Sequence, residues 1–346
     1  MSRPRMRFRT TFRTAPLIAP LIGAAAALLV AALGAAAEVR PAVVYDLGGK
    51  FDKSFNEAAH AGAEAFKAET GLDYAEFEIQ NDAQREQALR RFAQRGHDPV
   101  VAIGFSHGAA VDKVAREFPE VNFAIVDMVV DLPNVRSILF KEHEGSYLVG
   151  VMAAMASATG KVGFVGGMDI PLIRKFQCGY VGGVKATDPD AQVFANMTGA
   201  TGAAWTDPVR GGELARNQFG QGADVVFHAA GGTGLGVIQA AADAGRLAIG
   251  VDSNQNALAP GHVLTSMIKR VDQAVYDAFM DAKEDRWSAG FAVLGLAEGG
   301  VGIALDDHNA ALVTPEMLAA VEAATAAIIA GEITVHDYMS DETCPY

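Results

Sequence analysis

Short apolar runs alternate with longer amphipathic stretches along most of the chain. The runs are rich in Val, Ile and Phe, which favour strands, and the longer stretches carry apolar residues at helical spacing. In the first part of the chain this pattern predicts strands at 42–45, 74–79, 100–104, 123–127 and 135–140, with helices that include 55–69, 83–95 and 108–117. Alternation of strand and helix is typical of βαβ units around a parallel sheet.

A second series of the same kind follows. Strands are predicted at 162–165, 192–196, 225–229 and 247–251, with helices at 171–186, 208–218 and 234–244. The remaining units are a strand at 263–268, a helix at 271–284, a strand at 291–296 and a helix at 315–330. Two wound sheets in tandem, followed by single leftover units, indicate an α/β chain that passes repeatedly between two lobes. The length of 346 residues also favours two domains.

The first strand leads into a motif that points to a binding site. The strand stops at Asp46, two glycines allow a turn, and Ser54 with Glu57 three residues later predicts a capping box that opens the helix 55–69. Phe55 is thereby placed at a helix N-terminus beside the carboxyl end of a strand. In open parallel sheets this edge is where ligands bind.

The first 37 residues differ in composition from the rest. Five arginines without an acidic residue precede an apolar stretch from Leu17 to Leu33 and the small residues 34–37. This order predicts a secretory signal peptide that is cleaved after Ala37. An uncleaved membrane anchor is the alternative, although an apolar stretch of about 17 residues is at the lower end of spanning length. No cysteine stands at the cleavage point, so we expect a periplasmic protein without a lipid anchor.

The net charge and the cysteines indicate which partners and metal sites to expect. The formal net charge is −13, and removal of the five N-terminal arginines would take it to −18, which argues against nucleic acid as a partner. Cys178 and Cys344 are compatible with a disulfide in an oxidising compartment or with two separate buried thiols. Neither has a second ligand at zinc-type spacing, so no metal site is expected.

Several stretches resemble one known family. They are 46–56, which contains a Gly-Gly-x-x-Asp-Lys-Ser-Phe-Asn pattern, and 123–127, 170–176, 206–208 and 249–252. Together they are similar to the basic membrane protein family, whose members are substrate-binding proteins of ABC transporters and include purine nucleoside receptors. The resemblance spans essentially the whole chain after residue 37. It implies an exported monomer that delivers a nucleoside-like ligand to a permease in the membrane.

The resemblance also implies a fold and its division. The expected fold is the type I periplasmic-binding-protein fold, with two Rossmann-like lobes, three crossovers and a ligand clamped between the lobes. We expect residues 38–140 and 266–296 in lobe 1, and residues 141–265 and 297–346 in lobe 2.

Residues matched to the family motifs would form the ligand cage. Phe55 and Trp205 would stack on the two faces of a base, and Asp127 would read its edge. At the sugar end, Asp252 would hold the ribose hydroxyls and Lys269 would reach the same group. The other implied contacts are Asp46 as an acceptor with Asn56 nearby, the backbone at Gly231 and Gly232, and Ser106.

Physical chemistry is consistent with these roles. Stacking on an aromatic side chain contributes on the order of 1–3 kcal/mol per base, and carboxylates suit ligand donors such as hydroxyl and N–H groups. Lys269 would offset the charge of the surrounding carboxylates. Each residue also has a structural alternative: Phe55 and Trp205 as packing aromatics, Asp127 and Asp252 as loop caps, and Lys269 as a solvated lysine.

Two motifs in the sequence resemble motifs of enzymes. Ser106 stands in a Gly-x-Ser-x-Gly sequence between a predicted strand and helix, and Asp252 with His262 or His308 would complete the order of a hydrolase triad. Only three strands precede Ser106, however, and no His-Gly-Gly loop lies upstream. The glycines at 231–236 miss the dinucleotide spacing because Val237 occupies the third glycine position. We therefore expect no enzyme and no cofactor; the alternatives are a secreted serine esterase and a binding protein for a sugar or other non-aromatic solute.

Overall fold

The computed structural model describes residues 1–2, 9–11 and 39–346. It divides into two units, Met1–Glu38 and Val39–Tyr346. The predicted signal peptide, including its cleavage point after Ala37, lies outside the described residues apart from the two short pieces. In the part of the chain that is described, no helix has both the length and the apolar character to cross a membrane.

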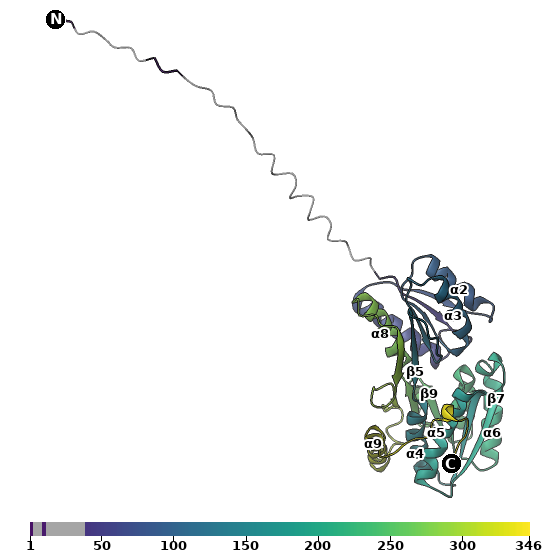
Figure 1. The fold of residues 1–346 in the computed structure, drawn as a ribbon. Coiled ribbons are helices and arrows are strands. Elements are labelled where there is room, and N and C mark those ends of the chain that lie inside the picture. The colour runs from purple at the N-terminus through teal and green to yellow at the C-terminus, as the bar shows by residue number, and fades with distance from the viewer. Residues whose placement is uncertain (3–8, 12–38) are drawn as a thin grey trace. The chain divides into compact units, whose positions relative to one another are not determined.

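Unit Val39–Tyr346 contains two six-stranded sheets, each forming the core of one lobe (Figure 1). The first sheet, which defines lobe 1, is parallel throughout and has the order β11-β5-β4-β3-β1-β2. Its strands are β1 (Ala42–Tyr45), β2 (Ala75–Glu78), β3 (Val100–Ala102), β4 (Phe123–Val126), β5 (Val135–Phe140) and β11 (Gly290–Leu294).

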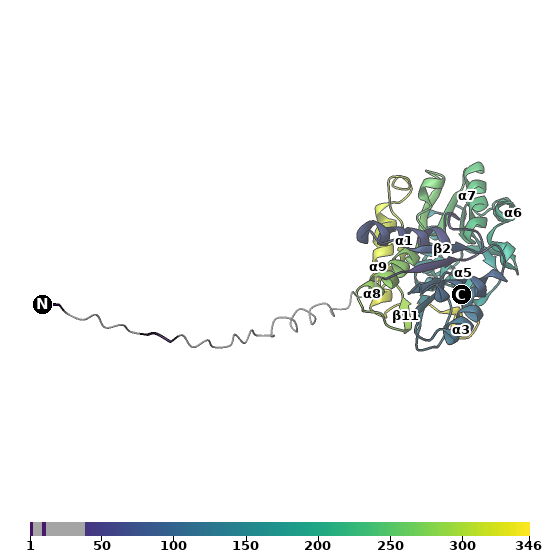
Figure 2. The same ribbon diagram turned by 90° about the horizontal axis from the view of Figure 1, so that it is seen from above.

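Helices cover both faces of the first sheet because its strands are apolar on both sides. Val43 and Val101 pack in the core cluster that also holds residues of α1 and α8, whereas Val44 and Ala102 pack with α2 and α3. Figure 2 shows α1 and α8 side by side. The helices are α1 (Phe55–Thr70), α2 (Gln84–Gln94), α3 (Gly108–Glu117) and α8 (Val271–Lys283).

The second sheet defines lobe 2 and has the order β12-β10-β9-β8-β6-β7. Its strands are β6 (Lys161–Met168), β7 (Gln192–Gly199), β8 (Val225–Ala229), β9 (Leu247–Asp252), β10 (Val263–Lys269) and β12 (Val301–Ile303), the last antiparallel to β10. Its helices are α4 (Glu142–Ala156), α5 (Pro171–Thr187), α6 (Pro208–Gly220), α7 (Gly234–Asp243) and α9 (Pro315–Ile329).

The chain crosses between the sheets three times, after β5, after β10 and after β11. The predicted two-lobed α/β fold with three crossovers is therefore confirmed. The second crossover follows Lys269, because β10 stays in the second sheet to that residue. The boundary expected between 265 and 266 was wrong, since it falls inside this strand.

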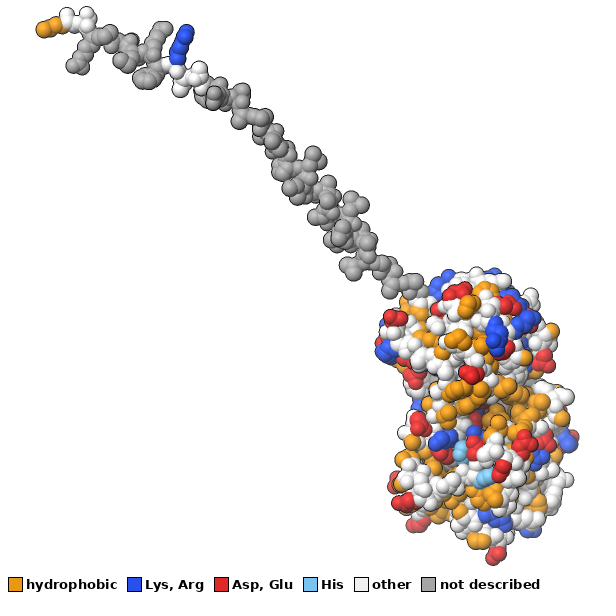
Figure 3. All heavy atoms as spheres, viewed as in Figure 1, with side chains coloured by type: hydrophobic (Ala, Val, Ile, Leu, Met, Phe, Trp, Pro, Cys, Tyr) orange, Lys and Arg blue, Asp and Glu red, His pale blue; other side chains and the backbone are white. Residues whose placement is uncertain are grey.

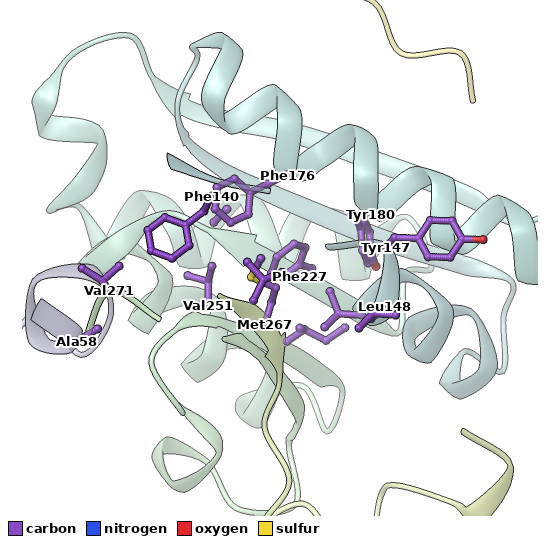
Figure 4. Packing of buried hydrophobic residues seen from close by; sticks show 14 of the residues in the cluster. Ala58, Phe140, Tyr147, Leu148, Phe176, Tyr180, Phe227, Val251, Met267 and Val271 are labelled. Atoms are coloured by element: carbon purple, nitrogen blue, oxygen red, sulfur yellow. The ribbon is translucent and has the colours of Figure 1, made fainter. Parts of the chain in front are cut away.

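Two elements were not predicted. Helix α4 is buried on nearly all sides from Glu142 to Ala153, so its sequence lacks the polar stripe that marks a surface helix. Strand β12 has three residues, too few for an alternation of apolar and polar residues to be recognised in the sequence. Figure 4 shows Tyr147 and Leu148 of α4 in the lobe 2 core with Tyr180 and Phe227.

A disulfide fixes the C-terminal segment to lobe 2. Cys178 on α5 is bonded to Cys344, with a Cα–Cα distance of 5.6 Å. The ring of Tyr346 lies against Gly182 of the same helix, where an added Cβ would come within 2.7 Å of it. The sequence allowed either a disulfide or two separate buried thiols, and the structure contains the disulfide.

Candidate ligand-binding site

A cavity lies between the two lobes, at the carboxyl ends of strands from both sheets. Together with its opening it encloses about 630 Å³ of space free of atoms. On the face shown in Figure 3, hydrophobic side chains gather at the waist between the lobes. The cavity is lined by Asp46, Leu47, Asp52, Phe55, Asn56, Gly104, Phe105, Asp127, Leu172, Ile173, Phe176, Trp205, Ala229, Ala230, Gly231, Gly232, Val251, Asp252 and Lys269. The structure thus brings together every predicted site residue except Ser106, which does not line the cavity but is hydrogen-bonded to Asp46 of its wall.

The start of α1 presents Phe55 to the cavity, but the predicted capping box does not form. Asp52 caps the helix instead: its carboxylate accepts hydrogen bonds from the backbone N–H groups of Ser54, Asn56 and Glu57 at 2.9, 3.0 and 3.1 Å. Burial raises the pKa of Asp52, and these three donors oppose that shift. The Ser54 hydroxyl is left free and donates to Asp252 Oδ2 of lobe 2 at 2.6 Å.

Asp46, at the end of β1, is held by a buried arginine that the sequence analysis missed. Arg85 Nη1 lies 2.7 Å from Asp46 Oδ1, and Ser106 Oγ donates to Asp46 Oδ2 at 2.9 Å. Arg85 belongs to the buried stripe of α2 with Ala88 and Leu89. A charged residue on the apolar face of an amphipathic helix is the signal that could have identified it.

Asn56 also makes contacts within the protein. Its side-chain oxygen accepts from the Asp46 N–H at 3.0 Å, and its amide group donates to the Asp46 carbonyl at 3.3 Å. These bonds tie the end of β1 to the first turn of α1. Asn56 therefore fixes the positions of Asp46 and Phe55 on the cavity wall.

Lys269, at the end of β10, is the centre of a buried charge cluster. Its ammonium group lies 2.7 Å from Asp127 Oδ2 of lobe 1 and 2.9 Å from Glu142 Oε1 at the start of α4. The rings of Phe55, Phe140 and Phe176 surround it, with centroids 5.0–5.6 Å from Nζ.

Glu142 extends the cluster away from the cavity. Its other carboxylate oxygen, Oε2, lies 3.0 Å from Lys175 Nζ, and this lysine donates to the Phe140 carbonyl. Glu142 and Lys175 were not predicted, because their partners lie far away in the sequence. Burial favours the neutral form of Glu142, but Lys269 and Lys175 outweigh it and lower the pKa of this carboxyl.

Two aspartates of the cavity, Asp127 and Asp252, have raised pKa values. Burial raises the pKa of Asp127 to about 6 and that of Asp252 to about 7, against the opposing charge of Lys269. Burial alone would lower the pKa of Lys269, but the carboxylates of Asp127, Glu142 and Asp252 raise it. Asp127 and Asp252 also have left-handed backbones, with φ values of 67° and 63°. Such strain in non-glycine residues is concentrated at functional sites.

Trp205 forms part of the lobe 2 wall. It ends the 3₁₀ turn η2 (Gly202–Trp205), and its ring lies so close to Gly167 that a Cβ there would overlap it. Gly231, with a φ of 54°, begins the turn η3 (Gly231–Thr233) beside the Trp205 backbone. Glycine at 231 therefore gives the wall a conformation that few other residues adopt.

The hydrogen bonds of Ser106 bear on the serine-esterase alternative. Ser106 lies in the 3₁₀ turn η1 (Phe105–His107), and its hydroxyl donates to Asp46. In residues 39–346 no histidine is hydrogen-bonded to Ser106, and Asp252 instead accepts from Ser54. His262 is bonded to the Arg246 carbonyl. The same residues contain no cluster of three or more side chains suited to hold a metal ion.

Comparison with known proteins identifies the family. Residues 40–337 match the family model described as ABC transporter substrate-binding protein PnrA-like. The chain is 34% identical over 321 residues to the Lactococcus lactis "ABC transporter nucleoside-binding protein BmpA", covering 86% of this chain and 89% of the relative. It is 36% identical to a Pyrococcus furiosus protein named an uncharacterized lipoprotein, covering 77% and 70% of the two chains.

A solved structure shows the same similarity. An ABC transporter solute-binding protein from Aeropyrum pernix K1 matches with a TM-score of 0.79 and 31% identity, over 86% of this chain and 93% of that one. The family expected from the sequence motifs is thereby confirmed. The chain belongs to the family of PnrA-like substrate-binding proteins of ABC transporters.

Proposed function

We propose that the chain binds a purine nucleoside, or a close relative, between its lobes and delivers it as a monomer to the permease of an ABC importer. The observation that carries this proposal is that Phe55 of lobe 1 and Trp205 of lobe 2 line one cavity with Asp127, Asp252 and Lys269. Two aromatic rings suit the faces of a base, and carboxylates suit N–H and hydroxyl donors. The nucleoside-binding relative from Lactococcus supports the same ligand class.

The charge around the cavity favours an uncharged ligand over a nucleotide. Lys269 pairs with Asp127 and Glu142, and Arg85, behind the wall, pairs with Asp46. A phosphate would have to compete with these carboxylates for either cation. We therefore expect nucleosides to bind more tightly than their monophosphates.

Export without a lipid anchor is part of the proposal. The family is extracytoplasmic, and the Pyrococcus relative is named a lipoprotein. This chain has two cysteines, Cys178 and Cys344, and both are in the disulfide. The composition of residues 1–37 supports a cleaved signal peptide and a periplasmic location.

Binding without catalysis is the proposed chemistry. Ser106 supports this because its hydroxyl is committed to the carboxylate of Asp46 and does not meet a histidine in the described residues. The ester-hydrolysis rate of the purified protein should equal that of its Ser106→Ala variant. A rate that falls with this substitution would favour the esterase.

A thermal-shift panel tests the ligand class. Nucleosides should raise the melting temperature, whereas pentoses and hexoses should not, because free sugars leave the faces of Phe55 and Trp205 uncovered. A ligand at 100 times its dissociation constant should add about 2.7 kcal/mol to the free energy of unfolding. Phe55→Ala should reduce the nucleoside shift. A clear shift from a sugar, with none from purine or pyrimidine nucleosides, would instead favour the sugar-binding alternative.

Binding and fold stability should respond to pH in opposite directions. Ionised Asp252 and Asp127, with pKa values of about 7 and 6, are the better acceptors, so nucleoside affinity should fall as the pH drops from 8 to 5.5. Both pKa values are raised above that of an ordinary aspartate. Their contribution to stability is therefore fully present below pH 4 and is lost as the pH rises through 6 and 7. Calorimetric titrations and urea unfolding over this range measure the two trends, and affinity that is flat with pH would contradict the acceptor roles.

A further inference from the structure

We infer that Ser54, a residue of lobe 1, is a positioning residue for the Asp252 carboxylate of lobe 2, so that the sugar end of the ligand site is complete only when the two lobes meet. This inference rests on the proposed nucleoside function. It assigns a role to a residue that does not line the cavity.

The Ser54 hydroxyl is available because of how α1 begins. The side chain precedes the helix and would ordinarily cap it, but Asp52 already accepts from the N–H groups of the first turn. Ser54 is fully buried, so its hydroxyl needs a partner inside the protein. It reaches across to lobe 2, 2.6 Å from Asp252 Oδ2 and 3.4 Å from the Val251 carbonyl.

This contact determines which part of Asp252 faces the cavity. Oδ2 accepts from Ser54, whereas Oδ1 has no protein donor among residues 39–346. Because Asp252 lines the cavity, Oδ1 is the acceptor available to a ligand hydroxyl. A carboxylate held at one oxygen loses less conformational freedom when the ligand binds, which increases affinity. A free Asp252 side chain would have to be ordered by the ligand itself.

The same segments offer a matched control. Ser253 Oγ donates to the Ser54 carbonyl at 2.7 Å, and Gln255 Nε2 donates to the Lys53 carbonyl at 2.8 Å. Both bonds join the lobes without touching the Asp252 carboxylate. Ser253→Ala therefore removes a cross-lobe bond of similar length while leaving the bond between Ser54 Oγ and Asp252 in place.

The experiment compares adenosine with adenine by calorimetric titration. Ser54→Ala should weaken adenosine binding on the order of 10-fold, because a hydrogen bond to a charged group is lost, and should change adenine binding about 2-fold at most. Ser253→Ala should affect both ligands to the same extent. In an Asp252→Ala background, Ser54→Ala should have little further effect on adenosine. Two results would overturn the inference and show that Ser54 only holds the lobes together. One is an equal loss of affinity for adenosine and adenine in Ser54→Ala. The other is a loss of adenosine affinity from Ser54→Ala that is as large in the Asp252→Ala background as in the wild type.

A titration without ligand separates this inference from the proposed function. Asp252 is faced by the Ser54 hydroxyl, Lys269, Asp52 and Asp127. Removing the hydroxyl should raise the Asp252 pKa, as followed by carboxyl NMR, whereas Ser253→Ala should not change it. Ser54→Thr, which keeps a hydroxyl, should restore the wild-type value and serves as the second variant if Ser54→Ala does not fold. An unchanged Asp252 pKa in Ser54→Ala would overturn the inference. Failure of wild-type protein to bind any nucleoside would overturn only the proposed function.

Discussion

Replacing Lys269 by methionine is expected to lower the free energy of unfolding by about 3–5 kcal/mol. The ammonium group is buried and lies within hydrogen-bonding distance of Asp127 and Glu142. Methionine fills a similar volume but leaves two buried carboxylates without this cation. Nucleoside binding should be lost as well, because Lys269 lines the cavity and separates the carboxylates around it. Urea unfolding with and without adenosine measures both effects.

Two controls isolate the charge. Lys53→Met removes a lysine whose partner, Glu57, is on the surface, and should change the free energy of unfolding by at most about 0.5 kcal/mol. The triple variant Asp127→Asn, Glu142→Gln and Lys269→Met removes the opposing charges together and should recover part of the loss. A loss in Lys269→Met no larger than in Lys53→Met would contradict the proposed importance of this buried cluster.

Removing the disulfide is expected to cost about 2–5 kcal/mol. Cys178 and Cys344 are 166 positions apart, so the bridge restricts a long segment of the unfolded chain. It also holds the C-terminal segment against α5. The Cys178→Ser, Cys344→Ser double variant should therefore unfold at lower urea concentration than the oxidised wild type.

Chemical reduction provides the control for this prediction. The reduced wild type and the double serine variant should have similar unfolding midpoints, because both lack the same bond. Adenosine affinity should stay within about 2-fold of the wild type, since neither cysteine lines the cavity. A double variant as stable as the oxidised protein would show that the bridge contributes little to the fold.

The sequence predicted the features that are encoded locally. Each lobe alternates buried strands with helices, and that alternation is visible in the order of apolar runs. The helix that presents Phe55 was predicted to begin where it does, because the polar residues before it form a recognisable boundary. Asp46, Asp127 and Asp252 were placed correctly at the carboxyl ends of their strands. In a parallel sheet all of these ends lie at the same edge, and here that edge lines the cavity.

Long-range pairing could not be predicted in the same way. Arg85 and Asp46 are 39 positions apart, and Ser54 and Asp252 are 198 apart. The start of α1 shows the difficulty. Ser54 and Asp52 are both residue types that cap helices well, so the sequence did not show which of them caps α1. Asp52 does so, and the Ser54 hydroxyl donates instead to Asp252 of the opposite lobe. Glu142 was missed together with α4, because a helix that is buried on nearly all sides lacks the regular spacing of polar residues by which a surface helix is recognised.

Native mass spectrometry with competing ligands tests directly whether the protein binds a purine nucleoside. The protein is incubated with an equimolar mixture of purine and pyrimidine nucleosides, their free bases, ribose, glucose and galactose, and the bound species is identified by its mass and by fragmentation. A purine nucleoside should occupy the protein, and Phe55→Ala and Asp252→Ala should both reduce its share of the bound ligand. A protein that retains a free sugar, and remains without nucleoside at every concentration tested, would contradict the proposed nucleoside binding.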